Sequence, residues 1–143
     1  MRKGFTLIEL LIVIIIVGVL ATLGIIQYQA VIEKARGAEA KQVISTLRSQ
    51  CAAIYLDTGA TTTCTAANLG VGVGIPGPAV ANCATTNYFY YNVANATPAV
   101  TFTATRCGAT GKSPAVANAT GKTLVLTTDM SNGSDVWSGT GGY

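Results

Sequence analysis

The chain contains no histidine, and only nine Lys or Arg and six Asp or Glu residues are spread over its 143 positions. Without an imidazole, a serine or cysteine enzyme would lack its usual general base. Zinc coordination is equally disfavoured, because the four cysteines include no CxxC pair and no histidine completes a site. The sequence therefore predicts a protein that is not an enzyme and that needs no cofactor.

Charge is scarce and unevenly distributed. The formal net charge is +3, which is too small a basic excess to indicate a nucleic-acid partner. Residues 10–26 carry no charge at all, whereas the C-terminal two thirds is rich in Ala, Thr, Gly and Asn. The length suits one domain, and a long membrane segment leaves about a hundred residues for a water-soluble core.

A short basic segment precedes a long apolar one at the N-terminus. Residues 1–4 read M-R-K-G, and residues 5–26 are interrupted only by Thr6, Glu9 and Thr22. As a helix, the apolar stretch spans roughly 33 Å, enough to cross a hydrocarbon core of about 30 Å. The basic flank favours a cytoplasmic N-terminus, so we expect a single-pass membrane helix with the rest of the chain outside the cytoplasm.

A secretory signal peptide is the main alternative for this segment. The apolar run is longer than the usual hydrophobic region, and no clear A-x-A cleavage site follows it. Glu9 also lies inside the run, where a carboxylate in hydrocarbon costs several kcal/mol and is normally kept for a purpose. A position at the membrane interface, where water reaches the carboxylate, is the simpler explanation of Glu9 and stays open.

The segment from Gly4 to Ile14, G-F-T-L-I-E-L-L-I-V-I, resembles the processing and methylation motif of type IV prepilins and secretion pseudopilins. The resemblance implies that a membrane peptidase and methyltransferase cuts after Gly4, removes the leader 1–4 and methylates the new amine of Phe5. It also implies an inner-membrane assembly platform and self-association through the helix. Glycine suits the cleavage position because it has no side chain to obstruct the protease.

Glu9 has a physical role in such an assembly. The ammonium of a processed Phe5 would enter a low-dielectric filament core, where an unpaired charge is costly. Glu9 can neutralise it within its own chain or from a neighbouring subunit, and the residues alone leave both options open. The resemblance implies the intersubunit version, in which the pair sets the axial register of an incoming subunit.

Residues 27–57 predict an amphipathic continuation of the helix. Its apolar stripe comprises Tyr28, Ile32, Ala35, Val43, Leu47, Cys51 and Ile54. Its charged residues, expected on a solvated face, are Glu33, Lys34, Arg36, Glu39, Lys41 and Arg48. The helix should end near Leu56, because Asp57-Thr58-Gly59 supplies a stop signal.

The remainder of the chain predicts a loop followed by a small sheet. Residues 58–87 are rich in Gly, Pro, Thr and Ala and are expected to form an exposed connecting loop. Strand signals then follow at Tyr88–Val93, Val100–Arg106, Thr123–Thr127 and Val136–Trp137. We predict an α+β, pilin-like fold in which residues 88–143 form a headpiece of three or four antiparallel strands packed on the C-terminal half of the helix.

Four cysteines, Cys51, Cys64, Cys83 and Cys107, follow the export segment. An even number in this context indicates two disulfides in an oxidising compartment, with three possible pairings. We favour Cys51 with Cys64 and Cys83 with Cys107, because each pair closes a short loop, worth roughly 3 kcal/mol in the chain-entropy model. Free buried cysteines are the alternative.

Two further groups of residues are candidate sites. Residues 129–135 place oxygen ligands at alternate positions, so Asp129 and Asp135 are candidates for a calcium site. An ordinary polar turn with Asn132-Gly133 at its tip is favoured, because only two carboxylates are available. The aromatic run Tyr88–Tyr91 is explained by strand alternation between core and surface rather than by an adhesive or electron-carrying patch.

The sequence therefore predicts a structural subunit of a type IV pilus-like filament, held in the inner membrane before assembly and extracellular or periplasmic afterwards. A pseudopilin of a type II secretion-like machine is the first alternative. By resemblance, paired cysteines would favour the pilin and calcium-dependent folding the pseudopilin. A single-pass anchored binding module that never polymerises is the alternative from a different class.

Overall fold

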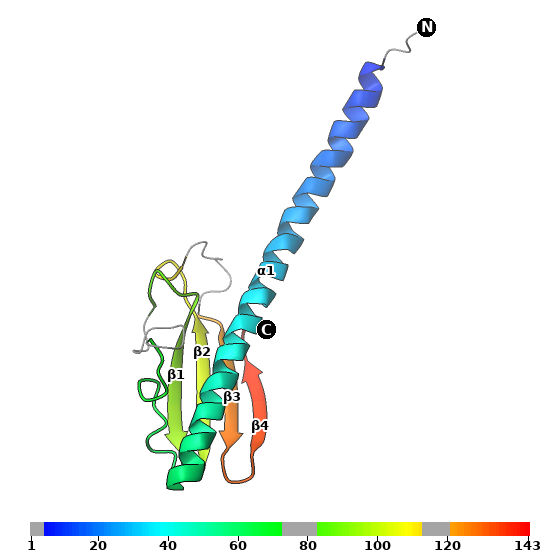
Figure 1. The fold of residues 1–143 in the computed structure, drawn as a ribbon. Coiled ribbons are helices and arrows are strands. Elements are labelled where there is room, and N and C mark those ends of the chain that lie inside the picture. The colour runs from blue at the N-terminus through cyan, green and yellow to red at the C-terminus, as the bar shows by residue number, and fades with distance from the viewer. Residues whose placement is uncertain (1–4, 73–82, 113–120) are drawn as a thin grey trace. The chain divides into compact units, whose positions relative to one another are not determined.

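The computed structural model describes residues 5–72, 83–112 and 121–143. The predicted leader 1–4, including Gly4, lies outside the described residues. Residues 73–82 of the expected connecting loop also lie outside them. The elements along the chain are α1 (Leu7–Thr58), β1 (Phe89–Ala96), β2 (Ala99–Arg106), β3 (Thr123–Asp129) and β4 (Ser134–Gly139) (Figure 1). The predicted α+β class, a long N-terminal helix with a small antiparallel sheet, is confirmed.

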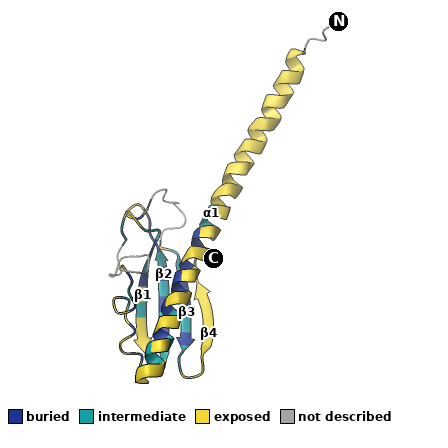
Figure 2. Ribbon diagram, viewed as in Figure 1, coloured by how far each residue is buried: buried dark blue, intermediate teal, exposed yellow. Residues whose placement is uncertain are grey.

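The chain divides into two compact units, Met1–Lys34 and Ala35–Tyr143. In the first unit, every residue from Phe5 to Val31 is exposed (Figure 2). This part of α1 is long and apolar enough to cross a membrane by length and composition. Its side chains are Leu, Ile and Val with few interruptions, so it presents apolar surface on all sides, as a helix does whose surroundings are not water.

Helix α1 is continuous because no proline occurs between Leu7 and Thr58. It ends where Gly59 adopts a φ of 69°, the left-handed conformation that commonly terminates helices and that glycine adopts without strain. The hydroxyl of Thr58 donates to the carbonyl of Ile54 at 2.8 Å and so adds a side-chain hydrogen bond to the last turn. The stop signal therefore acts two residues beyond the expected position near Leu56.

The second unit, which we call the headpiece, contains the four strands in the order β1-β2-β3-β4, each pair antiparallel. Phe89 lies opposite Arg106, Thr105 opposite Thr123, and Leu124 opposite Gly139, so these residues share one end of the sheet. We call it the Phe89 end. The opposite end, here the Asp129 end, carries the β1–β2 and β3–β4 turns (Figure 1).

The core lies between one face of the sheet and the second half of α1. Strands β2 and β3 alternate strictly between buried and half-buried residues, as expected when one face of a sheet is covered. The largest buried side chains of the interface include Phe102 and Leu126 from the sheet and Ile44 and Leu47 from the helix. A lone four-stranded sheet could not bury enough apolar area, so the helix supplies the second layer.

The buried stripe of the helix differs from the expected one. Val43, Leu47 and Cys51 are buried as predicted, but Tyr28 and Ala35 are exposed. In their place the buried set includes Arg36, Gly37, Ala40 and Ile44. The prediction that Arg36 belongs to a solvated face is wrong, because its guanidinium lies 4.2 Å from the ring centroid of Tyr88 and is covered there.

Residues 59–72 are more closely packed than the expected exposed loop. Leu69 and Val71 belong to the hydrophobic core, and the buried hydroxyl of Thr61 hydrogen-bonds that of Thr97 at 2.7 Å. Apolar side chains in a polar-looking segment reach the core because a disulfide joins Cys64 to Cys51 on the helix, with Cα atoms 5.4 Å apart. This part of the segment is therefore a layer of the headpiece rather than a solvated connection.

A second disulfide joins Cys83 to Cys107, whose Cα atoms are 5.6 Å apart. Of the three possible pairings of four cysteines, the structure has the one that closes two short loops. No described cysteine is free. The bonded cysteines are 13 and 24 positions apart in the chain. The N–H of Cys107 donates to the carbonyl of Tyr88 at 2.9 Å, so the second bond lies beside the start of β1.

Candidate functional site

The first turn of α1 is built around Thr6 and Glu9. The Glu9 carboxylate accepts hydrogen bonds from the backbone N–H of Thr6 at 2.8 Å and from its hydroxyl at 2.7 Å. The Thr6 hydroxyl oxygen in turn lies 3.4 Å from the backbone nitrogen of Glu9. This reciprocal pattern is a capping box, in which residues three apart satisfy backbone donors at the start of a helix.

Sequence reasoning missed this cap, although Thr6-x-x-Glu9 before an apolar run is its known signature. In the single chain, the carboxylate of Glu9 is bound by groups of Thr6, the residue that follows Phe5. The helix start therefore holds the acid next to the residue whose amine would be released by cleavage after Gly4.

An unbroken apolar surface follows the capping box. All its large side chains from Leu7 to Ile26 are at least 45% exposed in the single chain. Monomeric soluble proteins rarely expose contiguous apolar patches of more than a few hundred Å², and larger ones mark membrane or protein contacts. The N-terminal part of α1 is therefore a contact surface, and Glu9 is the acidic group in its first turn.

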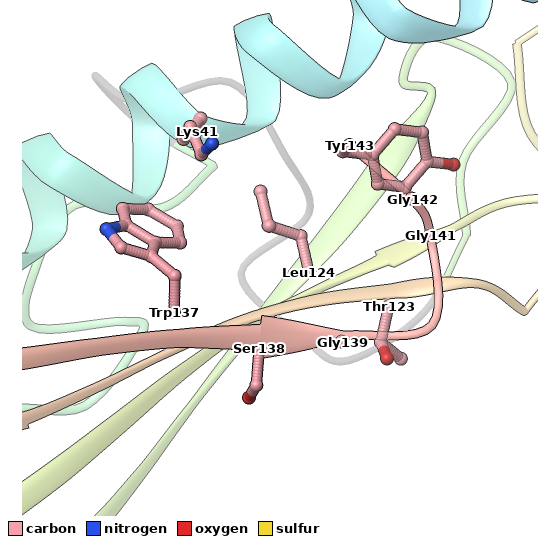
Figure 3. A pocket seen from close by; sticks show the side chains of 9 residues that line it. All are labelled: Lys41, Thr123, Leu124, Trp137, Ser138, Gly139, Gly141, Gly142 and Tyr143. Carbon is pink, nitrogen blue, oxygen red and sulfur yellow. The ribbon is translucent and has the colours of Figure 1, made fainter.

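The headpiece contains a half-open cavity of about 230 Å³ next to strand β4 (Figure 3). The Lys41 ammonium lies over Trp137, 5.2 Å from the indole centroid, and Leu124 and Tyr143 also line the cavity. Among the described residues, its lining includes no Asp, Glu or Cys side chain.

The calcium candidates Asp129 and Asp135 have protein partners in the described turn. Asp129 accepts from the backbone N–H of Ser131 at 2.9 Å and from its hydroxyl at 2.6 Å. These bonds, the side-chain one first, hold the pKa of Asp129 below its ordinary value. Asp135 accepts from Thr128 at 2.8 Å and pairs with Arg48 at 3.3 Å.

The turn is thus completed by hydrogen bonds within the chain. Asn132 accepts from the backbone N–H of Ser134 at 2.8 Å, and Gly133 has a φ of 73°. Over the described ranges 5–72, 83–112 and 121–143, no group of three His, Cys, Asp or Glu residues could hold a metal ion. The hydrogen bonds of Asp129 and Asn132 are those of a polar turn.

Three cations surround the ring of Tyr88 at the Phe89 end of the headpiece. The guanidinium carbons of Arg36 and Arg106 lie 4.2 and 5.1 Å from its centroid, and the Lys112 ammonium lies 5.0 Å from it. Such distances allow cation–π attraction. No local pattern predicts this group, because its members come from the helix, the residue before β1, the end of β2 and the segment after β2.

The neighbouring aromatic residues follow the alternation expected of a strand. Phe89 and Tyr91 are buried, whereas Tyr88 and Tyr90 are half-buried. Burial, and secondarily the negative charge of Glu39, raises the pKa of Tyr91 above its ordinary value. The aromatic run therefore contributes packing to the core and one ring to the cation group.

A long helix with an exposed apolar start, followed by a disulfide-bonded headpiece, defines the class of structural subunits that assemble through one helix. Comparison with known families agrees with this geometry. Residues 1–25 match the prokaryotic N-terminal methylation motif, and residues 34–142 match the family described as Pilin (bacterial filament). The chain belongs to the pilin family, whose members are filament subunits and not enzymes. No solved structure matched it significantly.

Proposed function

We propose that this chain is the structural subunit of a type IV pilus-like extracytoplasmic filament. It is stored as a single-pass precursor in the inner membrane with a cytoplasmic N-terminus. A prepilin peptidase and methyltransferase cuts it after Gly4 and methylates Phe5, and an assembly platform adds it to the fibre. The observation that supports this most directly is the wholly exposed apolar start of α1 with Glu9 in its first turn, inside the segment that matches the methylation motif.

The proposed chemistry of assembly depends on matching two charges. Cleavage releases the Phe5 amine, a positive charge that must leave the membrane edge and enter a bundle of apolar helices. Glu9 neutralises it, because an isolated charge of either sign is expensive in such a bundle. While the subunit is alone, the two donors of Thr6 satisfy the carboxylate. The incoming amine of a neighbouring subunit then replaces or joins them.

Two features of the headpiece favour a pilin over a pseudopilin. Its four cysteines are paired, and its calcium candidates Asp129 and Asp135 are engaged by side chains of their own turn and of α1. By family resemblance, the first feature is more typical of pilins, and the second gives both carboxylates partners within the chain. The pseudopilin function remains the competing proposal.

Mass spectrometry of the mature protein tests the processing step. We expect the N-terminal peptide to begin at Phe5 and to carry a methyl group on its amine. An intact Met1, or cleavage beyond Ala21, would show instead an anchored binding module or a secreted protein. Folding of the headpiece with and without a calcium chelator distinguishes the two filament types, and the pilus proposal expects no difference.

Electron microscopy of fibres tests the charge pair. Glu9→Ala should lower the fibre yield about tenfold or more, because it leaves the Phe5 amine unpaired. Thr6→Ala is the matched control, since it removes the cap and costs the helix about 1 kcal/mol while keeping the carboxylate. Normal fibre yield from Glu9→Ala, or an equal loss in both variants, would show that the acid serves the cap rather than assembly.

A further inference from the structure

The charges of the headpiece are separated between its two ends. Every charged residue from Ala35 to Tyr143 is among those the structure describes. Between the middle of the sheet and the Phe89 end lie five basic residues and one acidic residue: Arg36, Lys41, Arg106, Lys112, Lys122 and Glu39. Towards the Asp129 end lie one basic and three acidic residues: Arg48, Asp57, Asp129 and Asp135. The formal charges of the two ends are therefore +4 and −2.

Contacts and strand register fix this assignment. Arg106 ends β2 opposite Phe89, and its N–H donates to the carbonyl of Lys122 at 2.8 Å, which brings Lys122 to the same end. Arg36 and Lys112 both lie over the ring of Tyr88. The helix then runs towards the other end, where Arg48 pairs with Asp135, and Asp57 lies a further nine positions along (Figure 1).

The charges that solvent reaches have the same separation. At the basic end Lys41, Lys112 and the acidic Glu39 are exposed and Lys122 is half-buried; at the acidic end Asp57 and Asp135 are exposed and Arg48 and Asp129 are half-buried. Without the buried guanidiniums of Arg36 and Arg106, the basic end still carries +2 and the acidic end −2. Charges within reach of solvent act on a partner over about a Debye length, roughly 8–10 Å at physiological salt.

The C-terminus of α1 adds negative charge to the acidic end of the headpiece. Carbonyl groups at a helix C-terminus carry a partial negative charge that cations normally balance, yet the last turn contains no basic residue and does contain Asp57. The adjacent Leu56 is 86% exposed. This tip thus presents an acid, a helix dipole and an apolar side chain together. The basic end is complementary to it, because cations lie there beside the aromatic rings of Tyr88 and Trp137.

In a filament built by one repeated screw operation, neighbouring subunits meet through two different surfaces. Each contact joins two different surfaces of the same chain, because a head-to-tail interface that does not close into a ring generates an open helix. Complementary potentials on those surfaces orient the incoming subunit and suppress wrong contacts. A chain that carries both a basic and an acidic end supplies both halves of such a contact.

We propose that the basic end of one headpiece docks on the acidic end of another copy, with the Leu56–Asp57 tip of α1 meeting the surface of Lys41, Lys112 and Lys122. This inference rests on the proposed filament function and adds the headpiece contact that orients each new subunit. The partner is a second copy of this chain. A polyanion bound at the basic end is the alternative that the experiment separates.

Two full-length variants with inverted ends test the contact. Lys41→Glu/Lys112→Glu/Lys122→Glu changes the basic end from +4 to −2. Gln50→Lys/Ala53→Lys/Asp57→Lys changes the acidic end from −2 to +2, using three exposed positions of α1. Each variant alone places like charges against each other in every contact, whereas a mixture of the two can alternate with opposite charges facing throughout.

Fibres are counted by electron microscopy in cells that express each variant alone, both together, or the wild-type chain. We expect each variant alone to give about tenfold fewer fibres than wild type, because like charges repel across the contact. Co-expression should restore the yield and incorporate both variants into the same fibres. Because the mixture contains the same two chains, restoration also shows that both of them fold.

The contact would be overturned in three ways. Either variant alone could assemble at wild-type yield, or co-expression could restore nothing. In the third, the basic-end variant could keep its fibre yield and lose only retention of a double-stranded DNA probe, which would make that end a polyanion site. In each case normal wild-type fibres leave the filament function standing. A wild-type chain that forms no fibres would overturn both proposals together.

Discussion

The contact between Gly37 and Tyr143 gives the sharpest prediction for the headpiece. Gly37 is a buried position in the middle of α1, and a Cβ atom built there would come within 2.7 Å of the Cβ of Tyr143. The ring of Tyr143 packs edge-on against Phe89, with centroids 5.8 Å apart and planes at 76°. The perturbation is Gly37→Ala, the smallest change that places an atom in this space.

Two effects of opposite sign compete in Gly37→Ala. In an exposed helix interior, alanine is more favourable than glycine by about 1 kcal/mol. The added methyl group displaces the Tyr143 ring, which loses an aromatic pair worth about 0.5–1.5 kcal/mol, and overpacking typically costs another ~1–3 kcal/mol. We expect a net destabilisation of about 1–3 kcal/mol, because the steric effect exceeds the propensity gain.

A double-mutant cycle separates these effects. In a Tyr143→Ala background the obstructing ring is gone, so Gly37→Ala should stabilise the headpiece by about 0.5–1 kcal/mol. The sign of the substitution effect therefore reverses between the two backgrounds. Urea unfolding of the full chain in detergent micelles, followed by the fluorescence of the single tryptophan, Trp137, measures all four corners of the cycle.

Stabilisation of the wild-type background by Gly37→Ala would refute the reasoning. It would mean that Tyr143 does not occupy the space above Gly37, and that glycine is retained there for another reason. Equal effects in both backgrounds would lead to the same conclusion, because independent sites give additive free energies of unfolding.

Two further predictions concern the disulfide and the pH dependence of the headpiece. Replacing the Cys51–Cys64 pair by two alanines should lower the free energy of unfolding by about 3 kcal/mol, since it frees the closed loop in the unfolded chain; an unchanged urea midpoint would contradict this. The raised pKa of Tyr91 means that the folded state binds its proton more tightly than the unfolded state does. Its contribution is therefore complete below about pH 10 and is lost as the pH rises above that value, and Tyr91→Phe should flatten the decline seen in unfolding curves between pH 9 and 11.

The helix and the sheet were predictable because their signals are local. The apolar run of residues 5–26 and the stop at Asp57-Thr58-Gly59 placed α1 to within two residues. The strand signals at Val100–Arg106 and Thr123–Thr127 located β2 and β3, and the short Val136-Trp137 signal proved to be the centre of β4. The capping box of Thr6 and Glu9 was equally local and could have been found from the spacing of the two residues.

Predictions failed where burial depends on what lies opposite. The charge of Arg36 predicts a solvated position, and the turn formers in residues 59–72 predict a loop. In the structure, Tyr88 covers Arg36, and the Cys51–Cys64 bond holds the segment against the core. A residue's own chemistry does not report these neighbours, which come from distant parts of the chain.

The sequence by itself determined the exposed apolar start of α1, its acid at position 9 and the identity of the strands, since hydrophobic period and turn chemistry act between residues close in the chain. Only the tertiary structure decided that Gly37 makes room for Tyr143 and that the headpiece has a basic and an acidic end. Both features arise when antiparallel pairing brings residues dozens of positions apart to the same end of the sheet, and no local pattern encodes that distance.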